Sequence, residues 1–172
     1  SRWLRDFMRL LPARGRVLDL GCGGGRDSEA LLLHGPDAEP ADGSEAMARL
    51  AAKRLGRPVK VLRFDELSAV ERYDAVWANA SLLHVPRAAL DDVLAKVFRA
   101  LKPGGLHFAS YKSGCAEGRD TLGRYFNYPD RDSLTQAYAR SATWDILSLS
   151  DHVGEGYEGQ DWPWLAITAR RP

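Results

Sequence analysis

The chain has 172 residues, of which 45% are hydrophobic and 27% are charged, and its formal net charge is +1. This length fits one domain with a full core, so we expect residues 1–172 to form a single domain. The near-neutral charge argues against nucleic acid or an anionic membrane as a partner. No apolar run approaches the roughly 20 residues that span a bilayer. The two cysteines, Cys22 and Cys115, lack metal-ligand spacing, so we expect a cytoplasmic protein with reduced thiols and no metal.

The first part of the chain alternates helices with short apolar strands. In order, the pattern predicts a helix over 3–11, a strand over 16–20, a helix ending near Leu33, a weak strand near 38–41, a helix over 44–55 with Ser44 as its N-cap, and a strand over 59–64. Gly35-Pro36 and Gly56 follow the second and third of these helices, where a left-handed or helix-breaking residue is expected.

The second part continues the alternation and then changes character. It predicts a strand over 73–78, an amphipathic helix over 87–101, a strand over 106–110, an irregular segment over 111–131, a helix over 133–140, a strand over 144–150, an acidic glycine-rich loop over 151–161 and a last strand over 164–169. This order indicates an α/β fold, a Rossmann-like, doubly wound, three-layer αβα domain. Its seven-stranded sheet is expected to be mostly parallel, with an antiparallel last strand.

A glycine cluster follows the first strand, where the apolar run ends at Gly21, Gly23 and Gly25. A strand, a tight turn and a helix in this order are typical of a nucleotide-like ligand site, although a glycine-rich turn without a ligand has the same pattern. The dinucleotide fingerprint Gly-x-Gly-x-x-Gly fits less well, because Arg26 stands where its third glycine allows close helix packing.

Polar residues also follow the next strands, and ligands of such folds bind outside the carboxyl ends of the strands. Asp42 lies about 20 residues beyond the glycines, where a carboxylate can accept both hydroxyls of a ribose or cap the next helix. Asp65, after Phe64, can accept a hydrogen bond from an exocyclic amine beside an aromatic face, or be an exposed loop acid. Asn79 ends the strand that follows.

Five motifs in this order resemble those of the class I S-adenosylmethionine-dependent methyltransferases. They are Leu18–Gly25, Asp42–Ser44, Tyr73–Val76, Leu82–Pro86 and Leu101–Gly105. The continuation Gly25-Arg26-Asp27-Ser28 resembles the small tellurite-resistance-type bacterial methyltransferases. The likeness covers about residues 14–110, and it implies S-adenosylmethionine as the cofactor.

The resemblance implies a role for each matching position. Gly21 and Gly23 would face the methionine part of the cofactor, Asp42 the ribose, Phe64 and Asp65 the adenine, and Asn79 with Ala80 the methionine and sulfonium side. The cofactor-binding residues would also include Cys22, Arg26 and Gly43. Many relatives carry an N-terminal helix that closes over the cofactor, and little chain precedes Trp3, so that lid is expected to be absent or to lie outside this sequence.

The segment after the last parallel strand is expected to face the methyl group. Its candidate acceptor-binding residues are Arg119, Arg124, Tyr125 and Tyr128, which offer fixed donors for a polar or anionic molecule. A surface loop with packed tyrosines is the alternative. His84 and Tyr111 are candidate bases by location, with Asp120 and Tyr125 behind them, although His84 also fits a structural role. No base is assigned.

These observations predict methyl transfer to a small polar acceptor by direct in-line displacement. The run Asn79-Ala80-Ser81-Leu82 departs from the Asn/Asp-Pro-Pro-aromatic box of enzymes that methylate base amines, so a nucleic-acid substrate is not expected. Three alternatives stay open: a cofactor-binding protein without catalysis, an NAD-type oxidoreductase, and a macromolecule methyltransferase. A monomer or a homodimer is expected, without a membrane partner.

Overall fold

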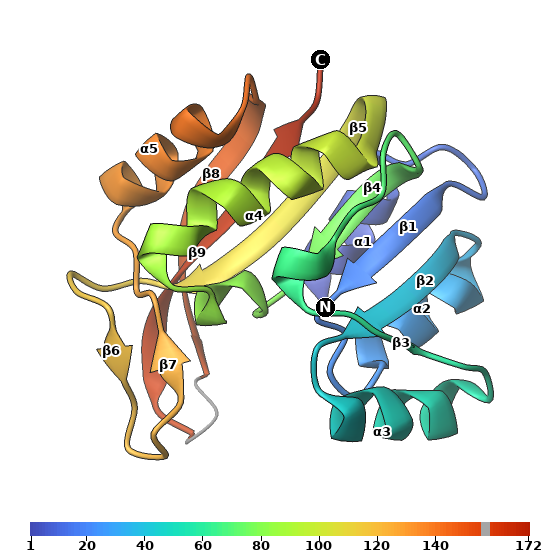
Figure 1. Cartoon of the computed structure of the whole chain (residues 1–172), viewed down its shortest axis with the longest axis horizontal. Coiled ribbons are helices and arrows are strands. Elements are labelled where there is room, and N and C mark those ends of the chain that lie inside the picture. Colours follow the sequence, from blue (N-terminus) through green and yellow to red (C-terminus); the bar gives the residue numbers. More distant parts are fainter. Residues whose placement is uncertain (156–158) are drawn as a thin grey trace.

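The computed structural model describes residues 1–155 and 159–172, and a seven-stranded sheet runs through its centre (Figure 1). From one edge to the other, the strands are β3 (Lys60–Val61), β2 (Asp37–Asp42), β1 (Arg16–Leu20), β4 (Tyr73–Ala78), β5 (Leu101–Lys112), β9 (Asp161–Arg170) and β8 (Asp145–Glu155). The first five are parallel, and β9 is antiparallel to both of its neighbours. The predicted mostly parallel sheet with an antiparallel last strand is confirmed.

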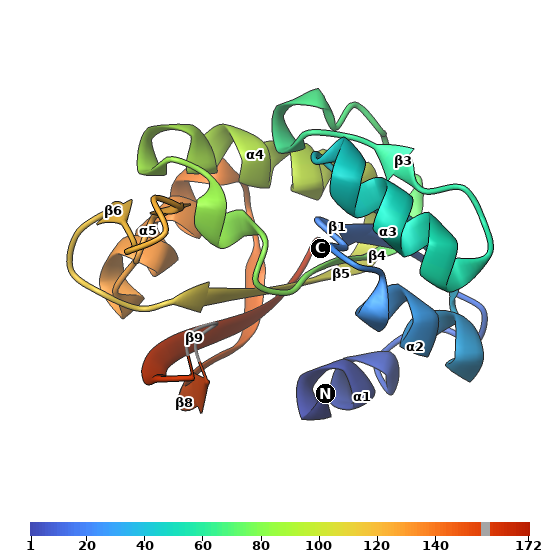
Figure 2. The same cartoon turned by 90° about the horizontal axis from the view of Figure 1, so that it is seen from below.

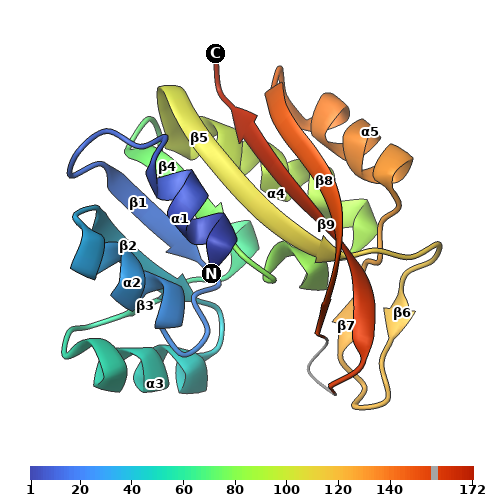
Figure 3. The ribbon, with the colours of Figure 1, turned by 180° about the vertical axis from the view of Figure 1, so that it is seen from behind.

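Helices cover both faces of this sheet, as the view in Figure 2 shows. On one face lie α1 (Arg2–Met8) and α2 (Arg26–His34), which stand in front of the strands in Figure 3. On the other face lie α4 (Arg87–Ala100) and α5 (Arg131–Ser141), while α3 (Glu45–Leu55) packs beside α2 at the β2–β3 edge. Short 3-10 turns, η1 (Phe64–Glu66) and η2 (Leu82–His84), follow β3 and β4.

Each face of the sheet has its own apolar core. Toward α1 and α2, Trp77 of β4 stacks on Phe108 of β5, with ring centroids 4.1 Å apart and planes 12° apart, and Phe7 of α1 lies 5.2 Å from Trp77. Toward α4, the amphipathic stripe Leu90, Val93, Leu94 and Val97 is buried. Burial of these large side chains is the main source of stability, at about 1.5–3 kcal/mol for each.

Two predicted strand boundaries were wrong. The strand over 59–64 is only Lys60–Val61, because Phe64 begins the 3-10 turn that faces the strand ends. The strand over 106–110 begins five residues earlier, at Leu101, directly where α4 ends. Its pairing with β4 shifts register between Tyr73 and Ala75, so Lys102–Gly105 forms an irregular start to the strand and not a separate turn.

The chain after β5 holds more regular structure than predicted. The segment 111–131 contains a small hairpin, β6 (Gly118–Arg119) and β7 (Tyr125–Phe126). The predicted loop over 151–161 is wrong at both ends, since β8 continues to Glu155 and β9 starts at Asp161; its residues 156–158 lie outside the described part. Polar residues fit β8 because it is an edge strand with one side open to solvent.

Parallel strands bring their carboxyl ends to one edge of the sheet. In Figure 1 these ends of β1, β4 and β5 point to the lower left, where the β6–β7 hairpin and the far ends of β8 and β9 hang. The glycine turn, Asp42, η1, η2 and the end of β5 therefore lie around a common edge.

Candidate active site

The glycine turn after β1 brings two strand ends into close contact. Gly21 has a φ of +79°, and a Cβ there would lie 2.4 Å from Cβ of Ser81, three residues after the end of β4. Gly23 has a φ of +52°, and a Cβ added there would meet no atom within 4 Å. The N–H groups of Gly21 and Cys22 both donate to the carbonyl of Ala41, at 2.8 and 2.9 Å. Because these donors are used within the protein, the turn is not a phosphate cradle, whereas the space before Gly23 is open.

Asp42, at the end of β2, connects the glycine turn to α3. Its Oδ2 accepts the N–H of Gly23 at 2.9 Å, and its Oδ1 accepts the N–H of Ser44 at 2.8 Å. The helix cap itself is Ser44, whose Oγ accepts the N–H of Met47. Each oxygen of an ionised carboxylate has two lone pairs, so Asp42 keeps acceptor capacity for two further donors.

A cavity of about 590 Å³ lies beside this turn and is lined by residues from three strand ends. Its lining residues are Gly43, Ser44, Arg63, Phe64, Asp65, His84, Val85, Pro86, Ala89 and Val93. The structure thus brings Gly43 together with Phe64 and Asp65, as the sequence predicted. Arg63 donates to Asp65, with its Nε 3.1 Å from Oδ1, and this hydrogen bond lowers the pKa of the Asp65 carboxyl.

The predicted residues Asn79 and Ala80 belong to a hydrogen-bonded network between α2, β4 and β5. Asp27 Oδ2 accepts from Trp77 Nε1 at 2.8 Å and from Asn79 Nδ2 at 3.0 Å. On the other side, Ser110 Oγ donates to Asn79 Oδ1 at 2.7 Å and accepts the N–H of Ala80 at 2.8 Å. This network fixes the orientation of the Asn79 amide and supports Ala80 at its positive φ of 51°. Asp27 and Ser110 had no predicted role, because their contacts depend on the packing of α2 and β5 against β4.

Asp19 lies under the glycine turn and is 2% exposed. Burial raises the pKa of its carboxyl to about 7; the hydrogen bond from Ser28 Oγ, at 2.5 Å, opposes this shift, and the charges of Asp27 and Asp42 add to it. Burial likewise raises the pKa of the Cys22 thiol to about 12, so that thiol stays protonated at neutral pH. Arg26, predicted beside the cofactor, is exposed at the first residue of α2.

Two of the predicted acceptor-binding residues hold the β6–β7 hairpin together. Arg119 Nη1 donates to the carbonyl of Gly123 at 2.7 Å, and Arg124 Nε donates to Asp120 Oδ2 at 2.8 Å. Tyr125 donates its hydroxyl hydrogen to Glu117, which lowers the pKa of that carboxyl. A role of these side chains toward an acceptor stays a prediction. Tyr128 stacks on Phe126 with centroids 5.2 Å apart.

The two candidate bases have different surroundings. His84 lines the cavity, and its Nδ1 lies 2.7 Å from the carbonyl of Tyr125. A carbonyl only accepts, so Nδ1 carries the hydrogen and Nε2 of the neutral ring can accept a proton. Tyr111 is fully buried, with its hydroxyl 3.4 Å from that of Tyr138, and burial raises its pKa. The prediction of Tyr111 as a candidate base is wrong, because its side chain points into the core under α5.

Residues 1–155 and 159–172 contain no group of three or more His, Cys, Asp or Glu side chains placed to hold a metal ion. Within the same ranges, no helix has the length and apolar character needed to cross a membrane. Cys22 and Cys115 are both free thiols.

Comparison with known proteins places the chain in a family. Residues 17–105, just over half of the chain, match the family model described as a methyltransferase domain. Trans-aconitate 2-methyltransferase of Variovorax paradoxus is 38% identical over 105 residues, which cover 56% of this chain but 38% of that protein. The chain therefore spans well under half of the length of this curated relative.

Solved structures confirm the fold. A protein described among the S-adenosylmethionine-dependent methyltransferases, from Methanosarcina mazei, superposes with a TM-score of 0.86 at 19% identity, covering 96% of each chain. TehB from Haemophilus influenzae superposes with a TM-score of 0.79 at 18% identity, covering 100% of this chain and 62% of that chain. With the family match over the glycine turn and the four strands around it, the chain belongs to the class I S-adenosylmethionine-dependent methyltransferases.

Proposed function

We propose that the protein transfers the methyl group of S-adenosylmethionine to a small polar acceptor by direct in-line displacement. The observation that carries the proposal is the joint arrangement of Gly23, Asp42 and the 590 Å³ cavity at one edge of the sheet. Open space, acceptor oxygens and an apolar pocket with an aromatic side chain follow each other there. This order in space fits the methionine, ribose and adenine parts of the cofactor in turn.

The residues that would hold each part can be named. Gly21 and Gly23 would lie along the methionine part, where the missing side chain of Gly23 leaves room. Asp42 would accept the ribose hydroxyls with the lone pairs that Gly23 and Ser44 leave free. Phe64 would cover one face of the adenine. Asp65 would accept a hydrogen bond from the adenine amine and would give up part of its contact with Arg63.

The acceptor side supports a small molecule over a macromolecule. The cited relative is named for a small acceptor, trans-aconitate. The run Asn79–Leu82 lacks the proline and aromatic pattern of base-amine methyltransferases, and the net charge of +1 offers no broad attraction for nucleic acid. We include a cytoplasmic location in the proposal, which the free thiols Cys22 and Cys115 support.

Catalysis in this proposal rests on positioning. The sulfonium supplies an activated methyl group when the cofactor is bound, and displacement requires the acceptor atom to be held in line with it. The network of Asp27, Asn79 and Ser110 would keep the sulfonium side of the site rigid. Where the acceptor must lose a proton, Nε2 of His84 would receive it, since Nδ1 is bound to the Tyr125 carbonyl.

Calorimetry with S-adenosylmethionine, S-adenosylhomocysteine and NAD tests the cofactor assignment. We expect both S-adenosyl compounds to bind and NAD not to bind; tight NAD binding without S-adenosyl binding would refute the proposal. Turnover is then measured on a panel of small acceptors that includes trans-aconitate. Cofactor binding with no methylated product from any member would favour a cofactor-binding protein without catalysis.

A further inference from the structure

Lys112 is the last residue of β5 and is only 9% exposed. Side chains two residues apart along a strand lie on the same face of the sheet. Lys112 therefore lies on the face of Ser110, which holds Asn79 at the predicted sulfonium side of the site, and opposite to buried Tyr111. Its position at the carboxyl end of a central strand is where ligands of this fold bind.

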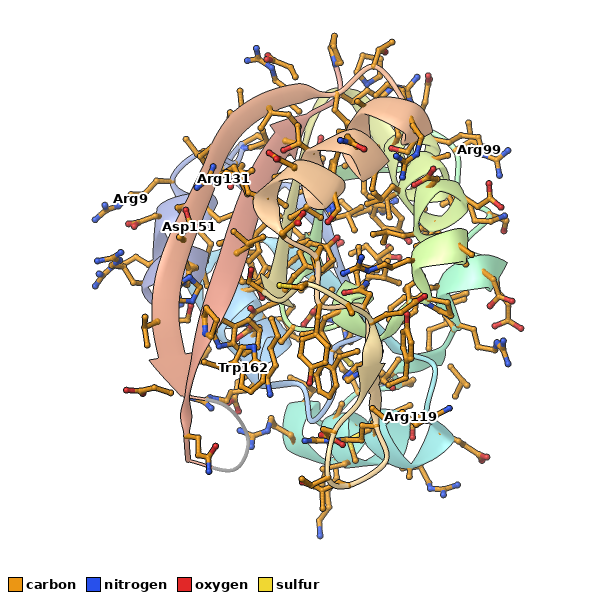
Figure 4. The ribbon with its side chains drawn as sticks, turned by 90° about the vertical axis from the view of Figure 1, so that its left-hand side faces the viewer. Arg9, Arg99, Arg119, Arg131, Asp151 and Trp162 are labelled. Carbon is orange, nitrogen blue, oxygen red and sulfur yellow. The ribbon has the colours of Figure 1, made fainter. Side chains whose placement is uncertain are left out.

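Aromatic rings surround the Lys112 ammonium. Its Nζ lies 4.8 Å from the ring centroid of Phe126 on β7, 5.4 Å from that of Trp162 and 5.9 Å from that of Trp164. Trp164 is the direct partner of Lys112 in the β5–β9 register, and Trp162 donates its Nε1–H to the carbonyl of Ser113 at 3.1 Å. Figure 4 shows Trp162 pointing inward from β9. The β6–β7 and β8–β9 hairpins thus both contribute aromatic rings around the Lys112 ammonium.

Among the side chains that the structure describes, those of residues 1–154 and 159–172, no carboxylate forms an ion pair with the Lys112 ammonium. Lys102, at the other end of the same strand, shows the usual arrangement: its Nζ lies 3.0 Å from Asp74 Oδ1. Aromatic faces attract a cation, but they replace only part of the hydration that burial removes. A buried cation that has no counter-charge among the described side chains is suited to bind an anion from outside the protein.

We propose that Lys112 determines acceptor specificity by binding a carboxylate carried on a planar, unsaturated or aromatic skeleton. This inference rests on the proposed methyl transfer and names the chemical class of its acceptor. A carboxylate fits better than a phosphate, because a single ammonium between apolar rings offers one charge, whereas phosphate sites gather several donors. The rings of Phe126, Trp162 and Trp164 supply flat surface for the skeleton.

Matched ligand pairs test the carboxylate preference. Small aromatic and unsaturated aliphatic carboxylates, each with its primary amide, and phenyl phosphate are titrated into the protein saturated with S-adenosylhomocysteine, with saturation-transfer NMR as the readout. We expect carboxylates to bind at least about tenfold more tightly than their amides and than phenyl phosphate. Equal binding within the pairs, no carboxylate binding, or a preference for phenyl phosphate would overturn the proposal.

Substitution then assigns the preference to this lysine. Lys112→Met keeps the length of the apolar stem and is expected to lose the carboxylate preference, while Lys112→Arg keeps it. Lys102→Met is the matched control on the same strand and is expected to behave as wild type. A Lys112→Met protein that still prefers carboxylates would overturn the proposal. If Lys112→Met does not fold, the Lys112→Arg comparison decides, because loss of the preference there would also contradict binding by a positive side chain.

The cofactor measurement separates this inference from the proposed function. S-adenosylmethionine is expected to bind Lys112→Met and wild type with the same dissociation constant. Weaker cofactor binding with an unchanged carboxylate preference would assign Lys112 to the cofactor and overturn the inference alone. Absence of S-adenosylmethionine binding by the wild-type protein would instead refute the proposed function.

Discussion

Two glycines of the same turn differ in what their missing side chains make possible. At Gly21 a Cβ would overlap Ser81, so the glycine allows two strand ends to meet; at Gly23 the space is open. Gly23→Ala is therefore expected to lower the free energy of unfolding by only about 1 kcal/mol, the cost of a positive φ. It should nevertheless raise the dissociation constant of S-adenosylmethionine at least about tenfold, because the new methyl group would enter cofactor space.

Gly21→Ala is the comparison for this prediction. Its steric overlap should destabilise the fold measurably in urea unfolding, whereas Gly23→Ala should unfold near the wild-type midpoint. Calorimetry gives the cofactor affinity of each. Unchanged affinity in Gly23→Ala would mean that the cofactor does not pass in front of this residue.

One carboxylate oxygen of Asp42 accepts a hydrogen bond from the glycine turn, and the other accepts one from Ser44, the N-cap of α3. A single carboxylate therefore shapes the proposed ribose site. Asp42→Ala is expected to weaken S-adenosylmethionine binding at least about tenfold, since it removes the ribose acceptors together with two internal hydrogen bonds. Asp37→Ala, at the other end of β2 and 3.9 Å from Arg16, is the control. Calorimetry showing equal affinity in both variants would restrict Asp42 to a structural role.

Single residues were predictable where their neighbours in sequence determine their surroundings. Asp42 directly follows a strand and precedes an N-cap serine, and that local pattern placed it correctly at the strand edge. The contacts of Asn79 depend on Ser110, thirty-one positions away, through the register of β4 against β5. Tyr111 was expected in the irregular segment after the strand. It belongs to β5, and its side chain faces the core opposite to Ser110, because adjacent strand residues face opposite ways.

The β6–β7 hairpin is a separate sheet of two strands with two residues each, so contacts with the rest of the domain must hold it in place. Arg87, at the start of α4, supplies it. Its Nε donates to the carbonyl of Asn127 at 2.7 Å and its Nη2 to that of Tyr128 at 2.6 Å. Asn127 in turn donates its N–H to Leu83 at 2.8 Å and thereby joins the hairpin to η2.

Arg87→Met is expected to release this hairpin. The loss of two charge-assisted hydrogen bonds should lower the free energy of unfolding by about 1–3 kcal/mol and speed hydrogen exchange at the Asn127 amide. The affinity for S-adenosylmethionine should change little, because Asp42 is held by the N–H groups of Gly23 and Ser44 and not by the hairpin. Arg99→Met, in the last turn of the same helix and pointing to solvent in Figure 4, is the control. Equal exchange at Asn127 in both variants would contradict the anchoring role.

Strands β1 and β4 and helix α4 were predicted within one or two residues. The helix predicted over 3–11 ends earlier, at Met8, and the strands that depend on pairing between distant residues were misjudged. Strands β1 and β4 match the predicted ranges 16–20 and 73–78 because both are mainly apolar runs in the centre of the sheet. The β8–β9 hairpin was read as shorter strands around a loop, because its outer halves are polar and are held by backbone pairing between distant residues. The β6–β7 hairpin was missed for the same reason.

For the whole molecule, two buried groups give the stability opposite pH dependences. Asp19 has a raised pKa of about 7, so its protonated form stabilises the fold below pH 4, and this contribution is lost as the pH rises through 7. Burial lowers the pKa of His107 to about 4, so stability is lost as the pH falls from 6.5 through 4. Between pH 4 and 6.5 the two contributions oppose each other, at up to about 4 kcal/mol each.

Asp19→Asn is expected to expose the His107 contribution. The variant's free energy of unfolding should rise steadily from pH 4 to 6.5, while that of the wild type changes little over the same range. At pH 8 the variant should be the more stable protein, because the wild type then carries a buried carboxylate. Urea unfolding at pH 4, 6.5 and 8 measures this, with His107→Gln as the reciprocal control. A variant whose profile parallels the wild type would show that Asp19 titrates normally.

The order of the parts along the chain has a consequence for how such a protein diversifies. The glycine turn, Asp42, η1 and Asn79 all lie within residues 17–105, whereas Lys112 and the rings around it come from the end of β5 and the two hairpins beyond it. Under the proposed roles, recombination or drift in the last third of the gene would change the acceptor and leave the cofactor-binding half intact. Lineages that share the first half are expected to differ most in these two hairpins.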